Sequence, residues 1–329
     1  MTILRLLLVV LLLAVPGVLV AACGSSDDDG SGASTATPAQ SAGVTPIARN
    51  EANAKVSLTI GSKNFTEQRV LGEIFAQALE AAGYTVKTRL DLGDERVALR
   101  ALRGGEIDAY PEYTGTALLS FFGEQPDKLP TDAQEAYKRA RRGFARLGLT
   151  AFPPTPFTSS NEVAVTQETA TRLSLQKISD LKGQERELTL AGSPECRGRL
   201  DCLRGLQDVY GLEFGRFAQT QIPQRHDALT SGKADVSIVF TTDPQIQRES
   251  EVLLEDDRSM FPPNNSSLVV RKEVADEAGP DLPRTLEMIQ ARLTDENMQE
   301  LNARVDLDGQ QPAEVAKAYL TENGLIGPS

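Results

Sequence analysis

Apolar and polar residues alternate along residues 56–60 and again along 85–92, and apolar residues recur at helical spacing between them, along 70–79. A period of two is typical of a strand with one buried face, and a spacing of three or four residues is typical of an amphipathic helix. Thr66 is a candidate N-cap for that helix. This part of the chain therefore predicts a strand, a polar loop, a helix and a second strand.

The same order of elements continues through the next hundred residues. A short helix ends at Gly104 and Gly105, a buried strand follows at 107–110, and Pro111 begins the exit toward another helix. An amphipathic helix is predicted at 133–147, with its charged residues on a solvated face. Strands that alternate with helices predict an α/β fold with parallel sheets.

A second unit of the same kind begins near residue 157, with strands predicted at 161–166 and 187–192 and helices at 177–181 and 203–210. It repeats part of the first unit. The matched pairs, each 127 positions apart, are Gly105 with Gly232, Asp108 with Asp235, Tyr113 with Phe240, and Thr114 with Thr241. The repeat predicts two pseudo-equivalent lobes.

The lobes are expected to exchange the chain twice, through 151–160 and 260–267. Lobe I then comprises 55–153 and 268–329, and lobe II comprises 154–267. In an open α/β sheet, ligands lie beyond the carboxyl ends of the strands. The loops that carry Tyr113 and Phe240 should therefore face a ligand cleft.

The N-terminal segment predicts export. Residues 1–22 carry one early arginine and an apolar run, as a signal peptide does, and small residues precede Cys23, which we expect to be lipidated. An uncleaved membrane anchor and a plain secretion signal remain the alternatives. Residues 23–54 are rich in Ser, Gly, Asp and Thr, and we predict that they form a disordered tether.

Composition and the absence of catalytic motifs argue against several classes of function. A net charge of −12 argues against a nucleic-acid partner. Cys196 and Cys202 lie six positions apart, which favours a disulfide in an oxidising compartment over a metal site. His226 is the single histidine and no nucleophile or phosphate-loop motif is present, so we predict no enzyme and no cofactor. Asp108 and Asp235 end equivalent glycine turns, which favours a structural role.

The motifs IGSKNFTEQ and GEIDAYPEYTGT, with GLQDVYGLEF and the later FPP, resemble the substrate-binding lipoproteins of glycine betaine, carnitine and choline ABC importers. The resemblance covers residues 56–318. It implies a bilobed type II periplasmic-binding fold, two lobes joined by two crossover segments. It also implies an extracytoplasmic, lipid-anchored monomer that delivers a small zwitterion or quaternary amine to an ABC permease and its ATPase.

The resemblance also assigns site residues. In this family the quaternary ammonium, which donates no hydrogen bond, is held by aromatic faces, and the carboxylate by basic and hydroxyl groups. By position, the anionic end would meet Lys63, Thr116 and Arg199. Tyr113 and Phe240 would be walls of the aromatic box. Tyr110, on the same strand as Asp108, is predicted to lie in the core.

Two further box positions depart from the family, because Asn161 and Asn264 stand where tyrosine is common. An amide has no electron-rich face but can donate and accept hydrogen bonds. We therefore hypothesise that the ligand keeps an anionic group and that its other end is more polar or larger than trimethylammonium. A more polar, amino acid-like ligand and a ligand sensor without transport are the alternatives. The sequence does not identify the ligand.

Overall fold

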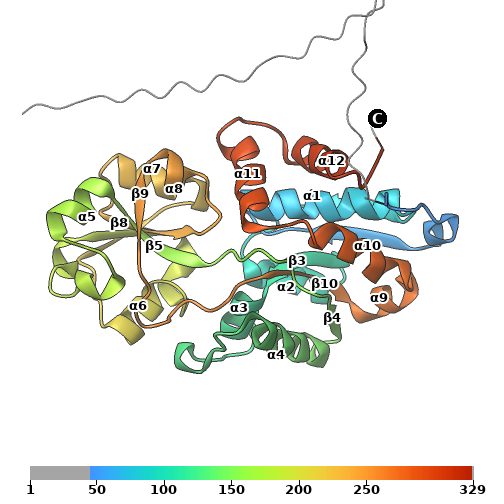
Figure 1. The fold of residues 1–329 in the computed structure, drawn as a ribbon. Coiled ribbons are helices and arrows are strands. Elements are labelled where there is room, and N and C mark those ends of the chain that lie inside the picture. The colour runs from blue at the N-terminus through green and yellow to red at the C-terminus, as the bar shows by residue number, and fades with distance from the viewer. Residues whose placement is uncertain (1–44, 328–329) are drawn as a thin grey trace, which may run out of the picture. The chain divides into compact units, whose positions relative to one another are not determined.

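The computed structural model describes residues 45–327, and these residues form two α/β lobes (Figure 1). Residues 1–22, Cys23 and most of the predicted tether lie outside the described residues. Within 45–327 no helix combines the length and the apolar character that crossing a membrane requires. The predicted fold class, with two lobes and two connecting segments, is confirmed.

Lobe I is built on a five-stranded mixed sheet. Strand β1 runs parallel to β2 and β3, whereas β10 runs antiparallel to both of its neighbours, β3 and β4. The strands, in spatial order, are β2 (Thr85–Arg89), β1 (Ser57–Gly61), β3 (Ala109–Tyr113), β10 (Ser266–Arg271) and β4 (Leu149–Ala151).

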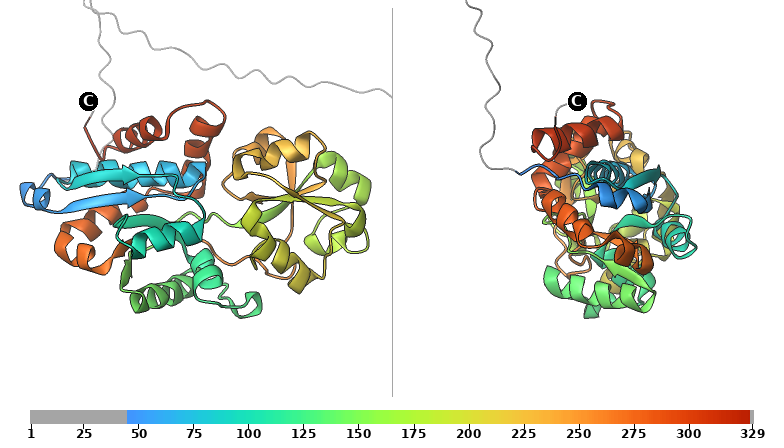
Figure 2. Two further views of the ribbon diagram at one scale, coloured as in Figure 1. Left: turned by 180° about the vertical axis from the view of Figure 1, so that it is seen from behind. Right: turned by 90° about the vertical axis from the view of Figure 1, so that its right-hand side faces the viewer.

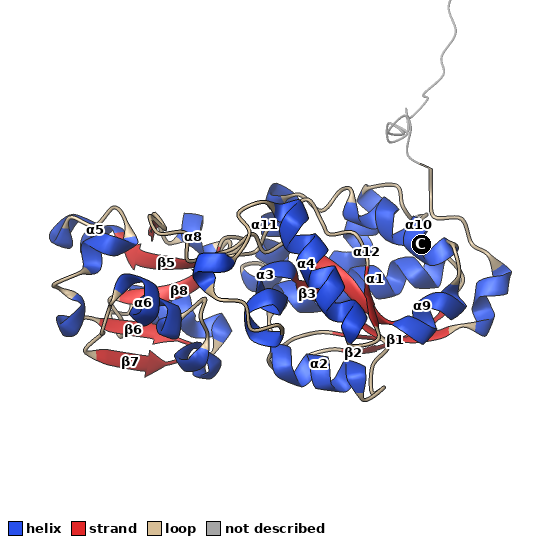
Figure 3. Cartoon of the chain, turned by 90° about the horizontal axis from the view of Figure 1, so that it is seen from below, coloured by secondary structure: helices blue, strands red, loops and turns tan. Residues whose placement is uncertain are grey.

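Lobe II has a sheet of the same design. In Figure 3 its strands β5, β8, β6 and β7 are drawn in red and lie side by side. Strand β6 is parallel to β7 and β8, and β5 is antiparallel to β8 and β9. The strands, in spatial order, are β7 (Arg216–Gln219), β6 (Thr189–Gly192), β8 (Val236–Phe240), β5 (Asn161–Thr166) and β9 (Glu251–Leu254).

The prediction of parallel sheets was wrong for one strand in each lobe. The antiparallel strands β5 and β10 are the first strands after the chain has crossed from the other lobe. Such a strand enters its sheet from the end that faces the partner lobe, whereas every other strand is reached by a connection within its own lobe. A pattern of alternating elements does not reveal this direction of entry.

Helices cover both sheets. In lobe I, the long helix α1 packs against α10, α11 and α12, so the C-terminal helices complete the core that the N-terminal part begins (Figures 1 and 2). The helices of lobe I are α1 (Thr66–Ala81), α2 (Glu95–Arg103), α3 (Thr114–Thr116), α4 (Ala133–Arg146), α9 (Lys272–Ala278), α10 (Asp281–Gln290), α11 (Asp295–Asp306) and α12 (Pro312–Glu322). Those of lobe II are α5 (Gln167–Leu173), α6 (Leu203–Tyr210), α7 (Arg225–Thr230) and α8 (Gln245–Arg248).

The two connecting segments, 152–160 and 255–265, are tied to each other. Thr158 and Asn265 form an antiparallel bridge between them. The side-chain Nδ2 of Asn265 also lies within hydrogen-bond distance of the carbonyl oxygens of Thr155, at 3.2 Å, and Phe157, at 3.0 Å. The lobes are therefore joined by a paired crossing and not by two independent linkers.

The predicted repeat appears as the same hydrogen bonds in both lobes. Asp108 accepts the backbone N–H of Thr59 at 2.9 Å, and Asp235 accepts that of Thr189 at 2.9 Å. Each aspartate follows a glycine with positive φ, +73° at Gly105 and +71° at Gly232. Each carboxylate thus fastens the start of its strand to the neighbouring strand, and this supports the structural role predicted for them.

Strand β3 continues further than predicted, through Pro111 and Glu112 to Tyr113. Pairing with β1 ends at Ala109, and the N–H of Thr114 faces β10. The nitrogen of Pro111 therefore points toward the side that has no strand partner, and the missing N–H breaks no ladder bond. The proline does not mark the exit from the sheet that the sequence indicates.

Folded structure begins before residue 55. Residues 51–55 form a 3₁₀ helix, and the N–H of Ile47 donates to the carbonyl oxygen of Leu325 at 2.9 Å. The buried Asn53 donates to the carbonyl oxygen of Ala82 at 2.9 Å. Residues 45–54, which the sequence places in the tether, are therefore attached to lobe I.

Candidate functional site

Residues of both lobes line a pocket that holds about 690 Å³ of empty space, part of it open to solvent. Its lining comes from strand ends and from the loops that follow them. It includes every ligand-binding residue that the sequence predicts, namely Lys63, Tyr113, Thr116, Asn161, Arg199, Phe240 and Asn264. We refer to this pocket as the cleft.

Three aromatic rings meet in the cleft, one more than the sequence assigns. Tyr113 ends β3 in lobe I, and Phe240 ends β8 in lobe II. Between them lies Phe65, whose ring centroid is 6.3 Å from that of Tyr113, with the planes at 21°, and 5.1 Å from that of Phe240. Phe65 stands two residues after Lys63 in the SKNFTEQ motif, so the motif itself could have revealed it.

The ring of Tyr113 is held by a buried carboxyl. Its hydroxyl donates to Oε1 of Glu67 at 2.5 Å, and Nδ2 of Asn302 donates to Oε2 at 3.1 Å. Burial raises the pKa of Glu67, although hydrogen bonds from Thr242 and Tyr113 oppose the shift. The hydrogen bonds fix the ring, so its orientation does not depend on a ligand. Tyr110, as predicted, is fully buried in the core and does not line the cleft.

Lys63, predicted to bind the ligand's anionic group, already has a partner in the protein. Its Nζ lies 2.5 Å from Oε1 of Glu112, and both side chains are buried. Nζ also lies 4.4 Å from the ring centroid of Tyr113, within the range of a cation–π contact. Glu112 was not predicted, because a carboxylate next to a proline gave no sign that it would be buried inside a strand.

Arg199 is held by carboxylates on two sides. Its Nε and Nη2 contact Asp201 at 2.8 and 2.5 Å, and its Nη1 lies 2.8 Å from Oε2 of Glu95 in lobe I. Burial lowers the pKa of Arg199, but Asp201 and Glu95 outweigh it and hold the pKa above its ordinary value. In Glu95 burial raises the pKa, and Arg199 with Lys63 lowers it further than burial raises it. All three nitrogens of this guanidinium therefore have partners.

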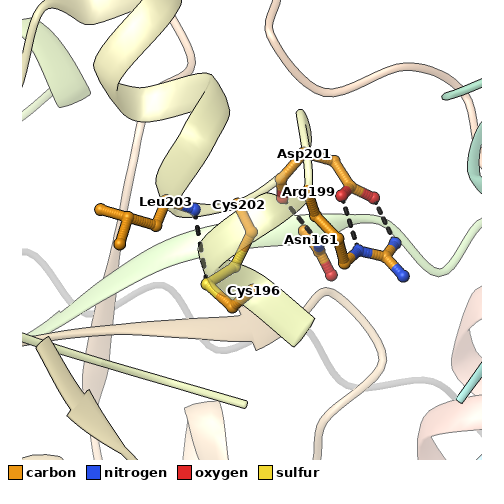
Figure 4. Close-up of a disulfide and its surroundings, with 6 residues drawn as sticks. All are labelled: Asn161, Cys196, Arg199, Asp201, Cys202 and Leu203. Atoms are coloured by element: carbon orange, nitrogen blue, oxygen red, sulfur yellow. Dashed lines mark hydrogen bonds and ion pairs between the residues drawn. A yellow bond between two sulfur atoms is a disulfide. The ribbon is translucent and has the colours of Figure 1, made fainter. Parts of the chain in front are cut away.

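The predicted disulfide is confirmed between Cys196 and Cys202, and Arg199 lies in the loop that it closes (Figure 4). Figure 4 shows the guanidinium of Arg199 side by side with the carboxylate of Asp201, and Asn161 beside both. The short closed loop restricts the backbone on either side of the arginine.

Asn161 and Asn264 also have internal partners. Nδ2 of Asn161 donates to the carbonyl oxygen of Asp201 at 2.7 Å. Nδ2 of Asn264 donates to the carbonyl oxygen of Ser159 at 2.6 Å, and its Oδ1 accepts the N–H of Thr116 at 3.0 Å. Asn264 thus joins both connecting segments to α3, and its amide atoms are used within the protein.

A second cation, Arg225, lines the cleft from lobe II and was not predicted. It is the first residue of α7, and its Cζ lies 3.7 Å from the ring centroid of Phe240. In the sequence it is one arginine among many, in a segment that carried no motif. Only the fold brings it to the end of β8.

The chain is similar to known proteins. Residues 56–322 match OpuAC, described as the substrate binding domain of ABC-type glycine betaine transport system. The chain is 36% identical to a glycine-betaine-binding protein of Pseudomonas aeruginosa, over 82% of this chain and 89% of that protein. It is 30% identical to the ergothioneine transport permease/ergothioneine binding protein EgtU of Helicobacter pylori, over 85% of this chain and 50% of that protein.

The fold is also similar to solved structures. The crystal structure of a glycine betaine/carnitine/choline ABC transporter superposes with a TM-score of 0.65 at 26% identity, over 82% of this chain and 99% of the other. Ligand-free YehZ of Escherichia coli superposes with a TM-score of 0.61 at 28% identity, over 82% of this chain and 99% of the other. The resemblance that the motifs carried is therefore confirmed.

Proposed function

We propose that the cleft binds a small betaine-like zwitterion for import, and the premise is that this chain belongs to the OpuAC family, the substrate-binding domains of ABC-type glycine betaine transport systems. Members of this family bind a substrate and do not convert it, so the protein is not an enzyme. The ligand would be delivered, on the outer side of the membrane, to an ABC permease that its ATPase drives from the cytoplasmic side.

The observation that carries this proposal is the cluster of Phe65, Tyr113 and Phe240 where the two lobes meet. The faces of aromatic rings attract a quaternary ammonium, which can be held by no hydrogen bond. Lys63 and Arg199 stand near them and attract the acidic group of a zwitterion.

The cleft also supports a ligand whose cationic end differs from a bare trimethylammonium. Asn161 and Asn264 provide no aromatic wall, and the ring of Tyr113 already lies against Lys63. A compact trimethylammonium would meet fewer rings here than in a complete box, whereas a larger or more polar end could contact the carboxylates of the lining. Relatives of similar identity have different ligands in their names, glycine betaine and ergothioneine, so no single name is transferred.

Localisation is part of the same proposal. Cleavage before Cys23 and lipidation of that cysteine would anchor the protein to the membrane, and the following residues would let a monomeric binding protein reach the permease. The support is the apolar run in 1–22 and the polar composition after it. Metabolic labelling with a palmitate analogue, with Cys23→Ser as the control, tests the anchor.

Calorimetric titration of the soluble protein tests the ligand class, after a thermal-shift screen with glycine betaine, carnitine, choline, ectoine, ergothioneine and amino acids. We expect at least one zwitterion with a quaternary or aromatic cation to bind, and we expect Phe65→Ala to weaken it about tenfold or more. Phe217→Ala, which removes a ring outside the cleft, is the matched control. If no compound of this class binds, the proposal is wrong. Tight binding of glycine betaine that Asn161→Ala and Asn264→Ala leave unchanged would overturn the part that concerns the cationic end.

A further inference from the structure

Arg225 is a buried arginine with hydrogen-bonding capacity that the protein does not use. Its residue exposure is 5%, and it lines the cleft at the start of α7. One terminal nitrogen, Nη2, donates to Oδ2 of Asp243. Its Nε is buried and has no hydrogen-bond partner among residues 45–327. A buried donor without an acceptor costs free energy, and this cost is removed when an acceptor arrives.

The carboxylate that Arg225 contacts is shared. Oδ2 of Asp243 also lies 3.0 Å from Nε2 of His226 and accepts the N–H of Phe240 at 2.7 Å. His226 in turn contacts Glu251 through Nδ1 at 2.9 Å. Asp243 therefore serves several donors, and the guanidinium beside it keeps donors for another acceptor.

The ring of Phe240 packs against the guanidinium of Arg225. The Cζ of Arg225 lies 3.7 Å from the ring centroid, the distance of a guanidinium stacked on an aromatic face. A stacked guanidinium still presents its N–H groups at its edge, in its own plane. Phe240, which the family resemblance assigns to the aromatic box, therefore stacks here on the side chain of Arg225.

The other cations of the cleft are less available. Lys63 lies against Glu112, and Arg199 contacts Asp201 and Glu95 with every guanidinium nitrogen. An anionic ligand at Arg199 would have to compete with these two carboxylates. At Arg225 an anionic ligand could accept a hydrogen bond from Nε without displacing another acceptor.

We propose that Arg225, stacked on Phe240, binds the carboxylate or another acceptor group of the ligand from lobe II and so selects acceptor-bearing zwitterions over simple quaternary amines. This inference rests on the proposed function. It assigns Phe240 the role of orienting Arg225, and it gives lobe II a direct polar contact with the ligand.

Titrations with glycine betaine and choline test this, because both probes carry trimethylammonium and only glycine betaine carries a carboxylate. Arg225→Gln should weaken glycine betaine binding about tenfold to a hundredfold and change choline binding by less than about threefold. Arg225→Lys, which keeps the charge but lacks Nε and the planar fork, should recover only part of the loss. Arg197→Gln is the matched control, because Arg197 stacks on Phe217 at 4.4 Å outside the cleft.

Thermal unfolding and circular dichroism of each variant separate a loss of fold from a loss of contact, and Arg225→Lys serves if the glutamine variant does not fold. Equal weakening of both probes, or none, would overturn this inference and leave the proposed function standing. If the wild-type protein binds another zwitterion of the screen and not glycine betaine, that zwitterion and its analogue without the carboxylate replace the two probes. Wild-type protein that binds no zwitterion of the screen would overturn both. A fall confined to glycine betaine supports the assignment.

Discussion

Arg199 of lobe II and Glu95 of lobe I form an ion pair across the cleft, with 2.8 Å between Nη1 and Oε2. Both side chains are largely shielded from solvent, at 17% and 5% exposure. Local structure positions each residue. Glu95 follows Asp94, the N-cap of α2, and Arg199 lies within the loop that the disulfide closes. A residue that we predicted to bind the ligand thus connects the lobes through the protein's own carboxylate.

Glu95→Gln should shift the protein toward an open arrangement of the lobes. The ion pair exists only when they approach, so its removal takes free energy from the closed state, and ligand affinity should fall about tenfold. Small-angle scattering and titration measure the two effects. Glu106→Gln is the control, because Glu106 pairs with Arg89 at 2.8 Å on the surface of lobe I. Equal scattering profiles for wild type and Glu95→Gln, with equal affinity, would contradict the bridging role.

Glu112→Gln should be strongly destabilising. The change removes the charge that balances Lys63, and both groups are buried. Breaking a buried pair on one side costs about 3–5 kcal/mol. Denaturant unfolding measures this, with Asp276→Asn as the control, because Asp276 pairs with Lys272 in solvent. A double change to Lys63→Met and Glu112→Gln should recover much of the lost stability, because it removes the unbalanced charge and keeps an acceptor for the buried hydroxyl of Tyr110. A double variant as unstable as the single one would argue against unpaired charge as the cause.

Removal of the disulfide should affect stability and binding together. Replacing Cys196 and Cys202 by serine releases a short loop, for which the chain-entropy account gives about 2 kcal/mol. Arg199 lies in this loop, so its contact with Glu95 should weaken too. Thermal unfolding and titration in the presence and absence of a reductant measure both. A lowered melting temperature with unchanged affinity would show that the loop does not position the arginine.

Stability should fall as the pH rises from about 4.5 to about 7, because of Glu162. Burial, helped by the charge of Asp256, raises the pKa of this carboxyl from 4.5 to about 7. The folded protein therefore keeps a proton that the unfolded chain releases, and this stabilisation, complete below pH 4.5, is lost by pH 7. Its size is at most roughly 3 kcal/mol. The fall of the melting temperature across this range should be smaller in Glu162→Gln than in the wild type and unchanged in Glu168→Gln. The slope that remains in Glu162→Gln belongs to other groups such as Glu67, whose pKa burial also raises. An unchanged slope in Glu162→Gln would assign the effect elsewhere.

Those parts of the fold and site that depend on local sequence could be predicted. The turns before Asp108 and Asp235 are marked by a glycine three residues earlier. The matched spacing in the two halves of the chain predicted that Tyr113 and Phe240 lie at equivalent strand ends. The motif that contains Lys63 also predicted that this residue lies at the cleft.

Features that depend on distant partners could not be predicted. The pairing of Lys63 with Glu112 requires β3 to continue past a proline, and that depends on where β1 stops. Arg225 reaches Phe240 only through the packing of α7 on β8. The antiparallel direction of β5 and β10 follows from the crossing between lobes, which leaves no periodic signal.

The place of β10 in the sheet of lobe I has a consequence for the order of folding. It lies between β3 and β4, but it follows the whole of lobe II in the chain. Lobe II therefore has all its strands while lobe I still lacks one from the middle of its sheet. Until β10 arrives, the edge of β3 stays unpaired, and an unpaired edge can associate with other chains. We expect lobe II to fold first during export, and we expect aggregation to begin from the incomplete sheet of lobe I.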